Sequence, residues 1–130
     1  MEGQASTTRT FKTAWFTKAA RKARISDAEL CEAIAAVMKG QADDLGGGVF
    51  KKRLDRNRQR SIALATSGGL WVYAYLFAKK DRANIEDDEL IGFRKLAKGF
   101  SALTPKQLSQ LLEDREWMEI CHDDQVQIQE

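Results

Sequence analysis

The chain has 130 residues, of which 43% are hydrophobic and 31% are charged, and its formal net charge is +2. This length and composition predict one folded domain and exclude an intrinsically disordered chain. No apolar run reaches the ~18–20 residues that cross a bilayer, and residues 1–10 lack the apolar core of a signal peptide, so we expect a cytoplasmic protein.

In chain order, residues 1–8 are polar and predict a flexible N-terminal arm. Residues 10–15 alternate weakly between apolar and polar side chains and predict a short strand, which a basic helix over 16–23 follows. A clearer amphipathic helix begins at Ser26, which precedes Glu29 by three residues, as in a capping box.

The periodicity changes from helical to strand-like after the three glycines at 46–48. We interpret these glycines as a flexible turn, because no strand precedes them and the Lys-Ser/Thr pair of a phosphate-binding loop is missing. Residues 49–55, 60–66 and 70–79 predict three strands, and Ser67-Gly68-Gly69 predicts a tight hairpin between the last two.

The helical period then returns. Asn84 is expected to cap a helix whose first turn carries the acidic run 86–89, and Thr104 is expected to cap a last short helix. Residues 121–130 form a polar tail. The order β-α-α-β-β-β-α-α predicts a single α+β domain over residues 9–120, with an N-terminal helical hairpin packed on a small antiparallel sheet and helices at the C-terminus.

Few residues are suited to nucleophilic or metal chemistry. Cys31 and Cys121 match no metal-binding spacing and are too few for a disulfide framework, so we expect two reduced thiols. The one histidine, His122, falls in the polar tail, which argues against Ser-His and Cys-His triads. A helix start explains the acidic run, so we expect no metal and no cofactor.

The small net charge hides an uneven distribution. Residues 49–82 carry nine Lys or Arg against two acids, whereas residues 83–130 carry five against eleven. A dense cationic centre of this kind is typical of polyanion binding. Lys and Arg along a solvated strand edge also prevent aggregation, and composition alone does not separate these two interpretations.

The strand periodicity sorts the cations onto faces. Alternate residues share a face, so Lys51 and Arg53 project together, while Phe50 and Leu54 face the core. Lys52 then falls on the apolar side, and we expect its side chain to reach out to an edge.

Antiparallel pairing would bring further cations to the same end of the sheet. Arg60 opens the next predicted strand, and Lys79, Lys80 and Arg82 lie at the exit of the strand after it. We expect the arginines of this surface to be exposed. A cationic surface without an imidazole or a metal suits phosphate chemistry performed by Lys and Arg alone.

Three segments resemble the RelE superfamily of bacterial toxins and, more narrowly, its HigB-like members. They are Phe11-Lys12-Thr13-x-Trp15-Phe16, Asp44-Leu45-Gly46-Gly47-Gly48-Val49-x-Lys51-x-Arg53 and Phe77-Ala78-Lys79-x-x-Arg82-Ala83-Asn84-Ile85. The resemblance runs from about Arg9 to Ile120 and implies a RelE-like fold.

This resemblance implies a metal-independent endoribonuclease that cleaves translated mRNA on the ribosome. It also implies an inhibitory partner, an antitoxin that in HigB-like systems is often a helix-turn-helix DNA-binding protein. Carried over by position, the catalytic and phosphate-binding residues would be Lys51, Arg53, Arg60 and Lys80. We expect the neighbouring cations to contact RNA, namely Lys52, Arg56, Arg58, Lys79 and Arg82.

Two other interpretations stay open. ParE-type toxins, a related branch, poison DNA gyrase by protein contact, and a non-catalytic RNA-binding regulatory domain would also retain the charge. The Lys-x-Arg pair at 51–53 together with Arg60 favours the nuclease. The sequence departs from RelE itself in two places: the loop 56–59 is short, and Glu86 stands near the position of an aromatic acid–base residue.

Overall fold

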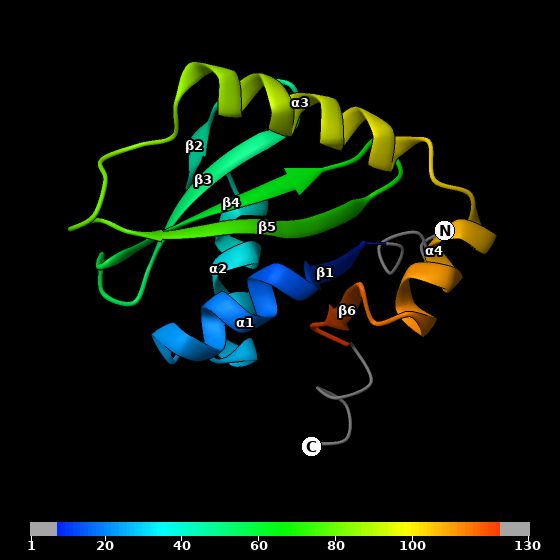
Figure 1. Cartoon of the computed structure of the whole chain (residues 1–130), viewed down its shortest axis with the longest axis horizontal. Helices are drawn as coiled ribbons and strands as arrows, with labels where there is room; N and C mark the ends of the chain where they lie inside the picture. The colour runs from blue at the N-terminus through cyan, green and yellow to red at the C-terminus, as the bar shows by residue number, and fades with distance from the viewer. Residues whose placement is uncertain (1–7, 123–130) are drawn as a thin grey trace.

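The computed structural model describes residues 8–122. The chain forms one six-stranded sheet with helices packed on both of its faces (Figure 1). The strands are β1 (Arg9–Thr13), β2 (Asp43–Asp44), β3 (Val49–Leu54), β4 (Gln59–Ala65), β5 (Leu70–Ala78) and β6 (Trp117–Ile120). The helices are α1 (Ala14–Ala23), α2 (Asp27–Met38), α3 (Asp87–Ser101) and α4 (Pro105–Glu113). Each helix of this described part is too short or too polar to span a membrane.

The predicted α+β class and the N-terminal helices packed on a sheet are confirmed, but the sheet is mixed. Its order is β2-β3-β4-β5-β1-β6, with β1 parallel to β5 and every other pair antiparallel. The prediction of an antiparallel sheet is therefore wrong, because periodicity shows where strands form and not which of them become neighbours. The sequence analysis also missed β2 and β6. The predicted arm up to residue 7 and the tail from residue 123 lie outside the described residues.

Side-chain caps begin three of the helices. Those at Ser26 and Thr104 were predicted, and the one at Thr13 was not. Thr13, Ser26 and Thr104 each accept a hydrogen bond from the backbone N–H three residues later. The third predicted helix begins later than expected, after Glu86, because the Glu89 carboxylate accepts from the Glu86 N–H at 2.6 Å.

The helices cover the two faces of the sheet unequally (Figure 1). On one face, α1 and α2 bury Phe16, Leu30 and Tyr73 completely, and the Tyr73 hydroxyl donates to the Leu30 carbonyl at 2.7 Å. Burial raises the pKa of this phenol. On the other face, α3 contributes one fully buried side chain, Ala97, over Ile62 and its neighbours. The α3 face is therefore the more open one.

A disulfide joins Cys31 of α2 to Cys121, which directly follows β6, across a sequence separation of 90 residues. The prediction of two reduced thiols is therefore wrong. The physical reason is β6: it adds to the sheet beside β1, and this position carries Cys121 to a Cα–Cα distance of 5.4 Å from Cys31.

An ion pair also fixes β6 to β1. The Arg9 Nε and Nη2 atoms donate to the two Glu119 carboxylate oxygens at 2.8 and 2.7 Å. These hydrogen bonds hold the pKa of Glu119 below its usual range, against the desolvation that burial causes.

Removing the disulfide should destabilise the domain. A bridge that closes a loop of this length restricts the unfolded chain, so the Cys31→Ala/Cys121→Ala variant should lose about 2–5 kcal/mol of unfolding free energy. Urea unfolding with and without dithiothreitol measures the loss. The reductant should shift the midpoint of the wild type and leave the double variant unchanged; equal midpoints for all four samples would contradict the bridge.

The Arg9–Glu119 pair should make stability depend on pH. Because the folded-state pKa of Glu119 is lowered, its stabilisation is complete above the ordinary Glu pKa of about 4.3 and disappears as the pH falls through the lowered value. The difference in Tm between the wild type and Glu119→Gln should therefore shrink below about pH 4.5. Glu113→Gln is the control, since Glu113 makes no ion pair among residues 8–122. A difference that stays constant with pH would exclude the charged pair as its cause.

Candidate functional site

Three cations from two strands share the α3 face of the sheet. Arg53 of β3 lies directly opposite Arg60 of β4, and Lys51 lies opposite Ile62. Opposed residues of an antiparallel pair share a face, so the expectation that Lys51 and Arg53 project together is confirmed. We call Lys51, Arg53 and Arg60 the basic row. The row continues into β5, because Arg60 also lies opposite Phe77.

Arg60 is held in place by the β3–β4 turn. Its Nη1 atom donates to the backbone oxygens of Asn57 at 3.0 Å and Gln59 at 3.3 Å, and its side chain is only 8% exposed. The expectation of an exposed Arg60 is therefore wrong, since a four-residue turn folds close enough to bond the guanidinium. No carboxylate within residues 8–122 forms an ion pair with it, so its charge is fixed and uncompensated.

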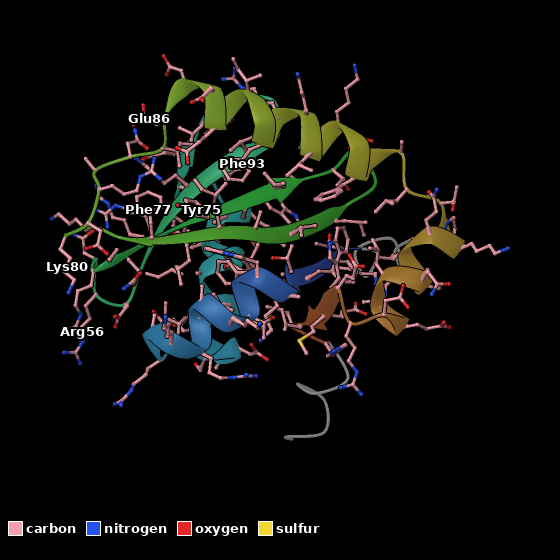
Figure 2. The ribbon with its side chains drawn as sticks, in the orientation of Figure 1. Arg56, Tyr75, Phe77, Lys80, Glu86 and Phe93 are labelled. Carbon is pink, nitrogen blue, oxygen red and sulfur yellow. A yellow bond between two sulfur atoms is a disulfide. The ribbon has the colours of Figure 1, made fainter. Side chains whose placement is uncertain are left out.

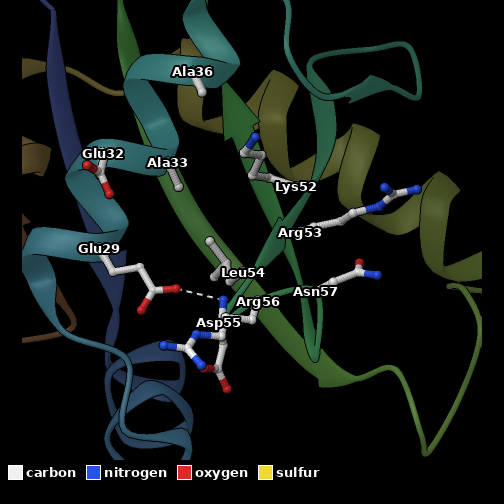
Figure 3. A pocket seen from close by; sticks show the side chains of 10 residues that line it. All are labelled: Glu29, Glu32, Ala33, Ala36, Lys52, Arg53, Leu54, Asp55, Arg56 and Asn57. Atoms are coloured by element: carbon white, nitrogen blue, oxygen red, sulfur yellow. Dashed lines mark hydrogen bonds between the residues drawn. The ribbon is translucent and has the colours of Figure 1, made fainter.

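The other two members of the row differ in exposure and in their contacts. Arg53 is exposed and points away from α2, on the same side as Asn57 (Figure 3). Lys51 is largely covered, and its Nζ atom donates to Asn84 Oδ1 at 3.2 Å and lies 3.7 Å from Asp43 Oδ2. The row therefore contains a buried arginine, an exposed arginine and a lysine hydrogen-bonded to Asn84.

The opposite side of β3 carries a pocket of a different character. It lies between α2 and the β3–β4 turn and has a volume of about 350 Å³. Its charged lining residues are Glu29, Glu32, Asp55, Lys52, Arg53 and Arg56 (Figure 3). Glu29 accepts the Asp55 N–H at 2.6 Å. Three acids balance three bases in this lining, whereas the basic row carries only cations, so we place the candidate site for a polyanion on the basic row.

Lys52 lies on this α2 side, as the alternation predicted. Its Nζ atom donates to the Gln41 carbonyl at 3.0 Å, which confirms that the ammonium reaches out to an edge. Lys52 therefore lies on the opposite face of β3 from the basic row, although it is the sequence neighbour of both Lys51 and Arg53.

The strand-exit cations lie at the same end of the sheet as the turn (Figure 2). Lys80 and Arg56 project outward there, and Lys79 is exposed beside them with its N–H bonded to the Arg58 carbonyl. Arg58 pairs loosely with Asp55 at 3.5 Å. These four side chains form a solvated cationic rim around the end of the sheet.

Arg82 holds neighbouring segments of the chain together. Its Nη1 atom donates to Glu89 Oε2 and to the Tyr75 hydroxyl, both at 3.2 Å, and its guanidinium lies 5.5 Å from the centre of the Phe77 ring. The hydrogen bond from Arg82 lowers the pKa of Glu89, and the same bond raises that of Arg82. Arg82 therefore ties the loop before α3 to the helix and to the sheet.

Sequence reasoning missed the aromatic part of the site. Tyr75 and Phe77 of β5 lie on the α3 face, with Phe93 of α3 beside Tyr75 at a ring-centre distance of 5.9 Å (Figure 2). Strand alternation in β5 contains the signal that these two side chains share a face. A prediction that they lie beside Arg60 would have required the register between β4 and β5.

The glycines at 46–48 form the turn between β2 and β3, which confirms the predicted turn, and they also contact α3. All three have positive φ, and a Cβ at Gly47 would lie 2.6 Å from Arg94 Cγ. The Arg94 guanidinium donates to the Leu45 and Gly46 carbonyls. This contact fixes α3 over Val49 and its neighbours, at one side of the basic row.

A protein-family model described as the RelE toxin of the RelE/RelB toxin–antitoxin system matches residues 8–120. The chain belongs to the RelE toxin family. No curated protein and no solved structure matches it. The family match covers almost all of the described residues of this RelE-family toxin, including the basic row, the aromatic pair on β5 and α3. In this described part, no three His, Cys, Asp or Glu side chains gather closely enough to hold a metal ion.

Proposed function

We propose that this RelE-family toxin is an endoribonuclease that cleaves translated mRNA on the ribosome. The observation that carries the proposal is the cross-strand pair Arg53–Arg60 with Lys51 on the same face. Like charges directly opposite each other destabilise a sheet, so a polyanion that binds there gains both attraction and relief of repulsion. Because translation takes place in the cytoplasm, the toxin would act there.

The proposed reaction uses the nucleophile that RNA already carries. The 2′-oxygen attacks the adjacent phosphorus, the bond from phosphorus to the 5′-oxygen breaks, and the products are a 2′,3′-cyclic phosphate and a free 5′-hydroxyl. One proton leaves the 2′-hydroxyl and one is delivered to the departing 5′-oxygen. The protein must align the attack, stabilise added negative charge and move these protons.

The site residues divide these tasks. Guanidinium groups bind phosphate oxygens in pairs and stay charged, which suits Arg53 and Arg60 to the phosphoryl oxygens in the transition state. Because two backbone oxygens already orient Arg60, less reorganisation accompanies binding. We assign proton transfer to Lys51 and contact with the RNA backbone to Lys80, with Arg56, Arg58 and Lys79 as further phosphate contacts on the rim.

We propose further that the toxin is of the HigB-like type and is inhibited by an antitoxin with a helix-turn-helix domain. The RelE/RelB family match supports an antitoxin partner, and the motifs around Trp15, Lys51 and Arg82 support the subtype. Acidic residues of the antitoxin should cover the basic row, and salt should slow their association. A complex that leaves the basic row and the ribosome-facing surface open would contradict this proposal.

Charge-removing substitutions in the basic row should abolish growth arrest. Arg53→Ala removes an exposed side chain and should leave the circular dichroism spectrum unchanged. Arg60→Ala also removes a buried side chain, so Arg60→Lys is tested beside it: it keeps the charge but loses the forked contact, and should lower cleavage by about 10²-fold or more. Lys106→Ala on α4 is the control and should stay toxic. Full toxicity of Arg53→Ala and Arg60→Lys would remove this site.

Cleavage should depend on the ribosome and not on a metal. A small domain has little surface with which to align a flexible strand, whereas a ribosome already holds mRNA in place, and alignment contributes several kcal/mol. Primer extension should show cuts in a translated reporter, unaffected by treating the toxin with EDTA, and few or none in the same naked RNA. Equal cutting of both would indicate a free ribonuclease. No cutting, with relaxed or broken DNA instead, would indicate a gyrase poison.

A further inference from the structure

One large aromatic side chain near the site is exposed although its neighbour is not. Trp15, in the first turn of α1, is 50% exposed, whereas Phe16 is fully buried. Single exposed apolar side chains are common, so the case for a binding role depends on what surrounds this indole.

Trp15 is held rigidly. Its ring centre lies 5.1 Å from that of Tyr75, with 30° between the ring planes. Tyr75 is fixed in turn by Phe77 at 5.8 Å and by the hydrogen bond between its hydroxyl and Arg82. A ring that is supported on one side and exposed to solvent elsewhere loses little conformational entropy when a second planar group stacks on it.

The groove around Trp15 is cationic. It has a volume of about 770 Å³ and runs between α1 and the part of β5 that extends beyond its pairing with β1. Four cations line it, Lys18 and Lys22 from α1 and Lys80 and Arg82 from the strand exit, together with the carboxylate of Asp81. Arg82 is already paired with Glu89, so the three lysines supply the available positive charge. A positive groove with an aromatic platform is the surface on which single-stranded nucleic acid binds, with phosphates along the cations and bases on the rings.

The groove adjoins the basic row through β5. Tyr75 and Phe77 lie on the same sheet face as Arg60, and Phe77 is the cross-strand partner of Arg60. Trp15 stacks on Tyr75, which lies two residues before Phe77 in β5. A strand whose phosphate lies at the basic row therefore reaches this groove with its neighbouring nucleotides.

We propose that Trp15 is a stacking platform for a base of the RNA strand, next to the phosphate that is cleaved. This inference rests on the proposed nuclease function and adds to it a residue that positions the substrate. The cations of the groove hold the phosphates on either side of that base. The charge of the groove favours RNA over an apolar peptide segment as the occupant, since an apolar segment would offer no counter-charge to Lys18, Lys22 and Lys80.

The test separates stacking from phosphate contact. Fluorescence anisotropy at low salt measures the affinity of the full chain for a labelled 2′-O-methyl oligoadenylate, which cannot be cleaved, and for an abasic oligomer of equal length. The wild type should prefer the oligoadenylate. Trp15→Leu should weaken its binding by about 5- to 100-fold without changing the abasic affinity, and Trp15→Phe should restore much of the loss. Lys18→Ala should weaken both oligomers equally.

Ile91→Ala is the matched control, because Ile91 is 52% exposed on α3 and should affect neither oligomer. No base preference in the wild type, or an unchanged one in Trp15→Leu, overturns the inference. A Trp15→Leu variant that loses affinity for the purified antitoxin alone overturns it as well. The nuclease function is judged separately, from cleavage of the translated reporter by the wild type and by Arg53→Ala.

Discussion

The register between β3 and β4 is the constraint on which the site depends. It sets Arg53 opposite Arg60, an arrangement that costs free energy because like charges face each other across the sheet. A slip of one residue would separate them, but it would also turn Leu54 away from the core, where this side chain is only 4% exposed. Packing on the α2 side thus enforces an electrostatic arrangement on the α3 side.

The helix that covers the α3 face is anchored at two points. Arg94 reaches the carbonyls at 45–46 at one side, and the Arg82–Glu89 pair holds the start of the helix. Gly92 and Gly99 lie on open surface, where a Cβ would meet nothing within 4 Å. These glycines lower the helix propensity of α3, and no close packing at either position requires a glycine. Anchoring, more than intrinsic helicity, therefore positions α3 beside the basic row.

The sequence predicts most of the local structure but little of the long-range strand pairing. Caps at Ser26 and Thr104 and the alternation of β3 and β5 predict elements because their signals lie within a few residues. Four-residue β6 has no such signal, and with it the disulfide and the parallel β1–β5 pair were missed. In the site, the shared face of Lys51 and Arg53 was predictable, whereas the burial of Arg60 required the path of the turn.

The disulfide and the β1–β6 pair also bear on how this chain folds. The strands of the basic row are joined by short turns, so their contacts close small loops and form early. The link from Cys31 to Cys121 and the pairing of β1 with β6 join opposite ends of the described chain and carry a larger loop-closure entropy. We therefore expect folding to proceed outward from the hairpins. The charged surface is assembled first, and oxidation of the two thiols locks the far edge of the sheet last.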